Sequence, residues 1–206
     1  MIHPYDLSHY KLTLPINKAG LLSGRAYEVF PPVPVDPYFQ ITDAGFIFMC
    51  PAKGATTATA SNPRTELRDK REYAHTTKFS DRLKLKVLQC PLEAKVVVHQ
   101  IHDADEPWLK MVWHQKRYGG LFYALIKASD GEKDTRLDLL EDVGNAQSII
   151  SYFEYDPNGL LMVKGNKAIK RLSVNRKGLG GKAYPKRGCY PSIKTAGLTA
   201  TVLHTK

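Results

Sequence analysis

Three short segments carry side chains that could bind an anion and move a proton. They are Arg64-Thr-Glu-Leu-Arg68, Gln100-Ile-His102 and Lys186-Arg-Gly-Cys-Tyr190. Arg, Lys and Gln donate hydrogen bonds to anionic groups, whereas His and Tyr can exchange protons. The three segments therefore indicate a site that holds an anionic group next to a proton donor and a proton acceptor.

The polar members of each segment are spaced two residues apart. In a strand, such residues point to the same face of the sheet. The residues predicted to share a face are Arg64, Glu66 and Arg68 in the first segment, Gln100 and His102 in the second, and Lys186, Gly188, Tyr190 and Ser192 in the third. A face of this composition is costly to bury as core. We therefore expect it to form the floor of a polar cleft.

Each segment alone also fits an ordinary structural role. Arg64, Glu66 and Arg68 could form a solvated ladder of ion pairs. His102 could be a hydrogen-bonded structural histidine, and Tyr190 is one of 11 tyrosines, most of which are expected to pack in the core. The occurrence of all three segments in one chain favours the functional interpretation.

The elements that must position these side chains are predicted to be strands. Runs rich in β-branched and aromatic residues, separated by Gly, Pro, Asn or Asp, occupy residues 11–15, 45–50, 82–88, 95–102, 109–114, 121–128, 135–140, 148–155, 160–163 and 198–204. Asp156-Pro-Asn-Gly159 predicts a hairpin turn. No segment sustains a helical stripe over three turns, and at most a short helix is expected near Asp69–Tyr73.

Many short strands in one chain predict an all-β fold, an antiparallel β-sandwich of jelly-roll type with a concave cleft. Length and 43% hydrophobic content fit a single domain over residues 1–206. Two loops stand out. Gly20–Pro37 is expected to wrap the surface, and Ala52–Asn62 is expected to form an arm beside the site.

The net charge of +10 is unevenly placed. Residues 1–156 carry 19 basic and 20 acidic side chains, whereas residues 157–206 carry 11 basic and no acidic ones. This asymmetry predicts an anionic partner, which could be a nucleic acid, an acidic polysaccharide or a membrane surface. No apolar run approaches the length that crosses a bilayer.

Cysteines and the N-terminus carry little information. Cys50, Cys90 and Cys189 form no C-x-x-C pair. The chain could therefore contain either one disulfide and one free thiol or three free thiols. No signal peptide is visible at the N-terminus.

The three segments resemble, in order, the signature segments of polysaccharide lyase family 7, the alginate lyases. Those segments read R-[ST]-E-L-R, Q-[IV]-H and Y-F-K-A-G-x-Y-x-Q, and the opening Tyr10-Lys-Leu-Thr-Leu-Pro15 also resembles the family's first strand. The third segment departs from the pattern, because Pro185 replaces Phe, Arg187 replaces Ala and Ser192 replaces Gln. The position of the family's catalytic tyrosine is kept as Tyr190.

The resemblance implies β-elimination at C5 and O4 of a uronate, which gives 4,5-unsaturated oligouronates without any cofactor or metal. Arg64, Gln100 and His102 match the family's carboxylate-neutralising positions, and Tyr190 matches its general acid. His102 would be the base for guluronate, and Tyr190 would serve as both acid and base for mannuronate. Substrate-binding roles are expected for the residues that surround them, Glu66, Arg68, Tyr184, Lys186 and Ser192.

The finer expectations follow from the same resemblance. Arg68 and Lys186 would bind neighbouring carboxylates, Glu66 would hold the arginines, and Tyr184 would stack on a sugar. Gln-Ile-His is associated in the family with guluronate-containing stretches, and we expect endo action. The enzyme is expected to be a secreted or periplasmic monomer whose partner is an acidic polysaccharide, with no nucleic acid and no membrane.

The sequence gives weaker support to several other functions. A metal site at His99, His102 and Asp103 is disfavoured because His99 and His102 should face opposite sides of a strand. Nucleic-acid binding is disfavoured by the lack of an RNP-type or helix-turn-helix pattern, and Gly178–Gly181 reads better as a hairpin turn than as a phosphate loop. No G-x-S-x-G elbow supports serine hydrolysis. A lyase for another polyuronate such as glucuronan and a non-catalytic module that binds acidic glycans remain as alternatives.

Overall fold

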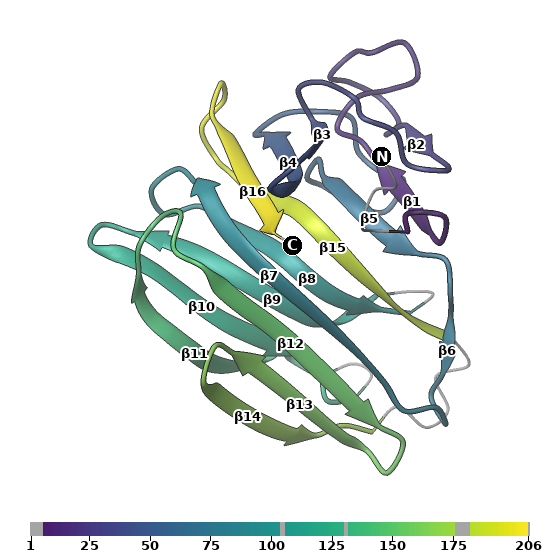
Figure 1. The fold of residues 1–206 in the computed structure, drawn as a ribbon, viewed down its shortest axis with the longest axis vertical. Coiled ribbons are helices and arrows are strands. Elements are labelled where there is room, and N and C mark those ends of the chain that lie inside the picture. The colour runs from purple at the N-terminus through teal and green to yellow at the C-terminus, as the bar shows by residue number, and fades with distance from the viewer. Residues whose placement is uncertain (1–5, 104–105, 130–131, 176–181, 206) are drawn as a thin grey trace.

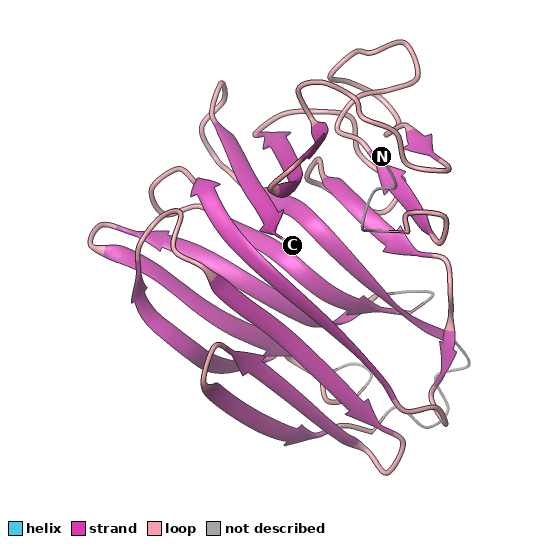
Figure 2. Ribbon diagram, viewed as in Figure 1, coloured by secondary structure: helices cyan, strands magenta, loops and turns pink. Residues whose placement is uncertain are grey.

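The computed structural model describes residues 6–103, 106–129, 132–175 and 182–205. Within these ranges the regular structure is entirely β, as Figure 2 shows, so the predicted all-β class is confirmed. The short helix expected near Asp69–Tyr73 is wrong. The Asp69 carboxylate instead accepts hydrogen bonds from the backbone and guanidinium of Arg71, and this closes a turn between two strands.

The strands form two antiparallel sheets. The nine-stranded sheet contains β1 (Tyr10–Thr13), β2 (Glu28–Val29), β5 (Thr65–Asp69), β6 (Tyr73–Ala74), β8 (Lys95–His102), β9 (Pro107–Lys116), β10 (Gly119–Ile126), β11 (Thr135–Val143) and β15 (Lys182–Ser192). The seven-stranded sheet contains β3 (Phe39–Thr42), β4 (Gly45–Pro51), β7 (Phe79–Gln89), β12 (Ile149–Asp156), β13 (Leu160–Gly165), β14 (Ala168–Ser173) and β16 (Thr199–Thr205).

The order of the strands brings distant parts of the sequence together. The nine-stranded sheet runs β11-β10-β9-β8-β15-β5-β1-β2, with β6 pairing to β15, and the seven-stranded sheet runs β14-β13-β12-β7-β16-β4-β3. In Figure 1, β7 and β12 cross in front of β8, β9 and β10, which shows the two layers of the sandwich. Because β15 lies between β8 and β5, the three motif-bearing strands are neighbours. The jelly-roll sandwich is thus confirmed.

Alternation along each strand explains where the core lies. Leu67 and Ile101 are fully buried and belong to the core cluster between the sheets, whereas their neighbours on the strand point to the other face. The largest buried side chains in the described residues are aromatic, among them Trp108, Trp113, Phe39, Phe48, Phe122 and Phe153. The polar side chains of the three motif strands therefore lie on the opposite face of the nine-stranded sheet, outside this core.

The structure contains the predicted turn Asp156–Gly159 and the predicted surface loop Gly20–Pro37. Asp156–Gly159 joins β12 to β13 as expected, with the amide of Asn158 bonded to the Asp156 side chain and Gly159 at φ +89°. The loop Gly20–Pro37 is mostly exposed, as expected, but it includes the short strand β2. Gly178–Gly181 lies outside the described residues. The described residues contain no helix that could span a membrane.

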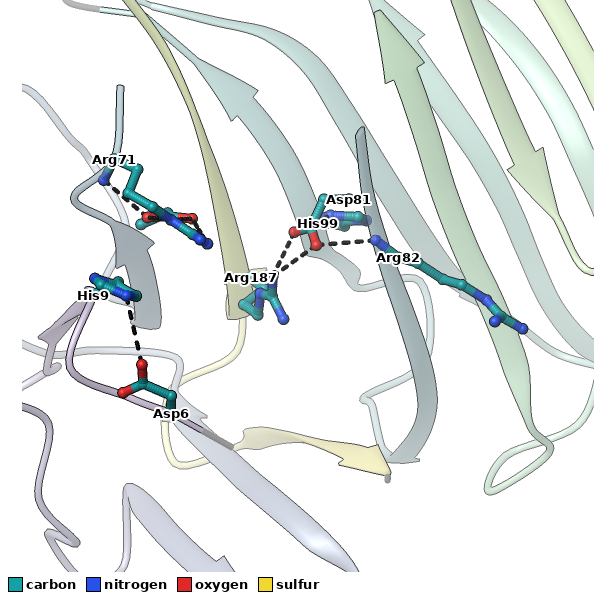
Figure 3. A network of polar contacts seen from close by, with 8 residues as sticks. Asp6, His9, Arg71, Asp81, Arg82, His99 and Arg187 are labelled. Carbon is teal, nitrogen blue, oxygen red and sulfur yellow. Dashed lines mark hydrogen bonds and ion pairs between the residues drawn. The ribbon is translucent and has the colours of Figure 1, made fainter. Parts of the chain in front are cut away.

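A buried polar network links the two sheets behind the motif-bearing strands (Figure 3). Nη2 of Arg187 on β15 donates to both carboxylate oxygens of Asp81 on β7, each at 2.7 Å. Nε2 of His99 lies 3.1 Å from the same carboxylate, and its Nδ1 lies 3.0 Å from the hydroxyl of Ser151 on β12. Although burial acts to raise the pKa of Asp81, His99 and Arg187 hold it below its usual value.

The three cysteines are all buried free thiols, which resolves the alternatives that the sequence left open. Burial raises the pKa of Cys90 to about 12 and moves the pKa of Cys50 and Cys189 upward as well. These thiols therefore stay protonated at ordinary pH and pack as small apolar side chains.

Candidate active site

A pocket of about 340 Å³ opens on the face of the nine-stranded sheet that points away from the core. The structure brings to this pocket eight of the nine site residues predicted from the sequence, namely Arg64, Glu66, Arg68, Gln100, His102, Tyr184, Lys186 and Tyr190. The arm Ala52–Asn62 contributes Thr57, Thr59, Ala60 and Ser61 to the same pocket, so its expected place beside the site is confirmed.

The pairing of β15 with its two neighbours explains why these side chains meet. Lys186 lies directly opposite Gln100 on β8 and Arg68 on β5, and Tyr184 lies opposite His102. Residues directly opposite each other in an antiparallel pair project from the same face. Residues that are far apart in sequence therefore form a single row of polar side chains across three strands.

Gly188 permits the close approach of β15 and β5 beside this row. Its φ is +152°, and a Cβ at this position would lie 2.3 Å from the carbonyl oxygen of Thr65. Between Arg187 and Tyr190 the pairing with β8 also shifts by one residue, as in a β-bulge. Glycine is therefore required here because any side chain would collide with the backbone of β5.

Glu66 is the buried anion of the pocket, with 3% of its surface exposed. Its Oε1 accepts a hydrogen bond from the side-chain amide of Gln100, and its Oε2 lies 3.5 Å from Nη1 of Arg64 and 4.0 Å from Nζ of Lys186. Arg68 pairs instead with Glu72, at 2.8 Å. The expectation that Glu66 holds both arginines is thus right for Arg64 and wrong for Arg68.

His102 is held as a neutral imidazole with a defined tautomer. Burial, helped by the charge of Lys186, lowers the pKa of His102 to about 4. Its Nδ1 lies within hydrogen-bond distance of the carbonyl oxygen of Asp103, and a carbonyl can only accept. Nδ1 therefore carries the proton, and Nε2 keeps a free lone pair that can accept one.

Tyr190 lies beside a cation. The guanidinium carbon of Arg64 is 4.0 Å from the centre of the Tyr190 ring, a cation–π contact between β15 and the residue that precedes β5. Arg64 is 8% exposed, and its Nε has no hydrogen-bond partner among the described residues. The guanidinium can therefore donate to an anionic group placed next to Tyr190.

Lys186 adds a second cation with unusual acidity. Burial, together with the charges of Arg64 and Arg68, lowers the pKa of Lys186 to about 8, although Glu66 acts in the opposite direction. The ammonium group is therefore charged at neutral pH and loses its charge in mildly alkaline solution.

Tyr184 does not present a free ring to the pocket. The ring stacks on His102 with centroids 5.4 Å apart and planes 15° apart, and the guanidinium carbon of Arg68 lies 3.9 Å from its centre. Only 6% of the residue is exposed. The expectation that Tyr184 stacks on a sugar is therefore wrong, because its ring is packed against protein. Its hydroxyl lies 3.2 Å from Nδ1 of His102 and helps to position the imidazole.

Ser192 is the one predicted site residue outside this pocket. It lines a smaller hollow of about 160 Å³ that also contains Tyr190 and lies farther along the same face. Ser192 also lines a larger hollow of about 690 Å³, whereas a hollow of about 740 Å³ is lined by none of the predicted site residues.

The structure also separates the residues that a metal site would need. His99 is fully buried between the sheets, whereas His102 faces the pocket, so the predicted opposite orientation is confirmed. Among the described residues, no group of three or more His, Cys, Asp or Glu side chains is placed to hold a metal ion.

Sequence reasoning missed several parts of the pocket. Thr13, Glu28 and Pro107 also line it, and the carbonyl of Asp103 sets the tautomer of His102. Thr13 and Asp103 lie next to the motifs in sequence or in the sheet, but only strand pairing reveals that Thr13 is opposite Glu66. The backbone role of Asp103 has no signal in the sequence.

Comparisons with known proteins agree with this arrangement. An alginate lyase from Pseudomonas aeruginosa is 20% identical, with 98% of this chain and 97% of that chain covered and a TM-score of 0.86. The alginate lyase A1-II′, a member of polysaccharide lyase family 7, is 23% identical, with coverage of 98% and 97% and a TM-score of 0.79. An alginate lyase from Klebsiella pneumoniae is 14% identical, with coverage of 98% and 95% and a TM-score of 0.85.

No curated protein sequence matches the chain. The structural neighbours establish the shared fold, and a family model described as alginate lyase matches residues 5–196, nearly the whole length. With the three motifs assembled in one pocket of a jelly-roll sandwich, this chain belongs to the alginate lyases of polysaccharide lyase family 7 and is a polysaccharide lyase.

Proposed function

We propose that this lyase cleaves alginate by β-elimination, and that Arg64, Gln100, His102 and Tyr190 carry out the reaction. The observation that carries this proposal is the meeting of a neutral imidazole, a phenol and two donors for a carboxylate in one pocket. Proton abstraction next to a carboxylate needs this combination, because the enzyme must stabilise the charge that develops there.

The difficult step is removal of the C5 proton, which is weakly acidic because the adjacent carboxylate is already an anion. Arg64 and the second amide N–H of Gln100 donate to that carboxylate, since the first amide N–H is bonded to Glu66. As the C5–H bond breaks, its electrons form the C4=C5 double bond and the C4–O4 bond breaks. Charge that spreads onto the carboxylate in the transition state is stabilised by these donors.

The proton transfers are assigned from the tautomer of His102 and the position of Tyr190. In guluronate the C5 proton and O4 lie on opposite faces of the sugar, so Nε2 of His102 takes the proton and Tyr190 gives one to O4. In mannuronate both lie on one face, and Tyr190 serves both steps.

The solved relatives support the assignment of the two proton-transfer residues. A variant of A1-II′ in which one histidine and one tyrosine are replaced has been solved with a substrate written GGMG. For this chain, Gln100-Ile-His102 supports acceptance of guluronate-containing regions. A cleft that continues past Tyr190 supports endo action on a long polymer. Because such a polymer does not cross membranes, we place the enzyme outside the cytoplasm.

The proposal is tested with the Tyr190→Phe variant. The wild-type chain should release products whose C4=C5 double bond, conjugated to the carboxylate, absorbs in the ultraviolet. Removal of the phenolic proton should lower kcat by about a thousandfold, in the range of general acid–base catalysis, while alginate binding is retained. Polymannuronate, polyguluronate and glucuronan are compared, with products identified by mass. Full turnover by Tyr190→Phe would contradict the assignment.

A further inference from the structure

Tyr190 lines two hollows on the same face of the nine-stranded sheet. One is the pocket that contains Arg64, Gln100 and His102, and the other is the hollow of about 160 Å³ that contains Ser192. The ring of Tyr190 therefore stands between them. The proposed reaction uses only the first hollow for the uronate that loses its C5 proton.

Strand pairing shows that the second hollow continues the first across the sheet. Tyr190 on β15 is opposite Val97 on β8, Val97 is opposite Val112 on β9, and Val112 is opposite Tyr123 on β10. Such partners share a face, and neighbouring strands are spaced about 4.8 Å apart. The row therefore runs at right angles to the strands and leads away from the catalytic tyrosine.

The floor of the second hollow is apolar, although it lies outside the core. Val112 and Tyr123 are each only 2% exposed, yet neither belongs to the core cluster between the sheets. Together with Val97, Leu125 and Pro191 they form a compact apolar surface. Val112 and Tyr123 lie beneath this surface, and the guanidinium carbon of Arg136 is 4.2 Å from the centre of the Tyr123 ring, so a ligand would meet the half-buried side chains of Val97 and Leu125. These side chains suit the C–H face of a sugar ring, and polar groups at the rim fix its orientation.

The rim carries the charge that a uronate needs. Lys95 and Lys110 both line the hollow. Nζ of Lys110 lies 2.7 Å from the Asp134 carboxylate, so that its charge is largely compensated. Lys95 is exposed and has no ion pair in the part of the chain that the structure describes. A carboxylate in this hollow would therefore pair with Lys95.

The chemistry of the elimination determines which sugar ring would occupy the second hollow. O4 leaves with the sugar on the non-reducing side of the cleaved bond, and Tyr190 donates a proton to O4. That sugar must lie on the side of Tyr190 opposite the uronate held by Arg64 and Gln100. We propose that the hollow is the subsite for this leaving uronate, with Lys95 as the residue that binds its carboxylate. This inference rests on the proposed function.

The test uses three variants of the full chain with alginate as substrate. Lys95→Ala should raise KM about fivefold, the effect of losing one exposed charged contact, and should leave kcat within about twofold. It should also reduce the dependence of KM on salt, because one screened contact is gone. Lys95→Arg should restore KM. Lys170→Ala, which removes an exposed lysine from β14 on the opposite sheet, is the matched control and should behave as wild type.

The outcomes separate the two proposals. If the wild-type chain releases no unsaturated product from any polyuronate, the proposed function and this subsite are both wrong. If the wild type is active and Lys95→Ala keeps the KM and salt dependence of wild type, the subsite alone is wrong. An equal rise in KM for Lys95→Ala and Lys170→Ala also overturns it, because the effect would then belong to net charge and not to the hollow.

Discussion

The Oε1 atom of Glu66 accepts a hydrogen bond from the side-chain amide of Gln100. This bond settles which end of the amide faces the carboxylate and aims the remaining N–H at the pocket. Because the Oε2 atom of Glu66 also contacts Arg64 and Lys186, one buried carboxylate orients three donors, which lie on β8, on β15 and at the residue before β5. Glu66 is thus a positioning residue that never needs to touch the proton being transferred.

Replacing Glu66 should therefore reduce catalysis more than binding. In Glu66→Gln the amide of Gln100 loses its charged acceptor, and we expect kcat to fall at least tenfold, since each misaligned donor stabilises the transition state less well. The pKa of Lys186 should fall below its value of about 8, because Glu66 is the group that raises it. Kinetics and a titration of Lys186 by NMR check both. An unchanged kcat would show that Gln100 is oriented without Glu66.

The acid limb of the pH profile should lie far below the pKa of free histidine. His102 has a pKa of about 4, so its Nε2 stays available as base down to that pH. We expect kcat/KM on polyguluronate to be nearly constant between about pH 5 and 7, whereas an unshifted histidine would show a fall near pH 6.5. Rates across this range are the measurement, and a limb near 6.5 would refute the buried neutral state.

The lowered pKa of His102 also makes the stability of the folded chain depend on pH. Since the pKa of His102 is lower in the folded chain, the unfolded chain binds the proton first as pH falls from about 6.5 to about 4. Stability present above pH 6.5 is therefore lost over this window, by about 3 kcal/mol for this group. His102→Gln should lose less over the same window. Urea unfolding at pH 7 and pH 4.5, followed by tryptophan fluorescence, checks the difference.

Lys186 should set the alkaline limit of polymer binding. As pH rises through about 8, its ammonium group loses the proton and the attraction for carboxylates weakens, so KM should rise. In Lys186→Arg the charge persists, because guanidinium stays protonated above pH 12. The alkaline rise in KM should then disappear. An identical profile for wild type and Lys186→Arg would assign this limb to another group.

The inter-sheet pair of Asp81 and Arg187 should be needed for stability as a pair (Figure 3). Asp81→Ala leaves the mostly buried guanidinium without its partner and should cost about 3 kcal/mol. The double variant Asp81→Ala/Arg187→Ala should recover part of this loss, since no uncompensated charge remains. Denaturant unfolding of both variants measures the coupling, and additive losses would argue against it.

The faces of the motif strands could be predicted because side-chain alternation is a local property. Arg64 and Glu66 could be assigned to one face of their strand, and Gln100 and His102 to one face of theirs, without any knowledge of strand order. The partner of Arg68 could not, because Glu72 approaches only after the turn that follows β5 has closed. The burial of Tyr184 likewise depends on β8 and β5 on either side of β15.

Short and polar strands escaped prediction for a related reason. β2 and β6 have two residues each, which is too few for a periodic pattern. β14 is exposed at most positions, so no alternation of apolar residues marks it. Arg187, which departs from the family pattern, is explained by Asp81, a residue 106 positions away. Pairings of this range follow from the fold and leave no trace in a single sequence.

The place of β15 between β8 and β5 also governs when the enzyme becomes active during folding. β8 and β5 are complete early in the chain, but each leaves an edge unpaired until residues 182–192 arrive from the last quarter of the sequence. Contacts of such long range form slowly. Lyase activity should therefore appear last in refolding, after the hairpins of β9, β10, β12 and β13, and it reports completion of the sandwich more faithfully than any spectroscopic signal from a single sheet.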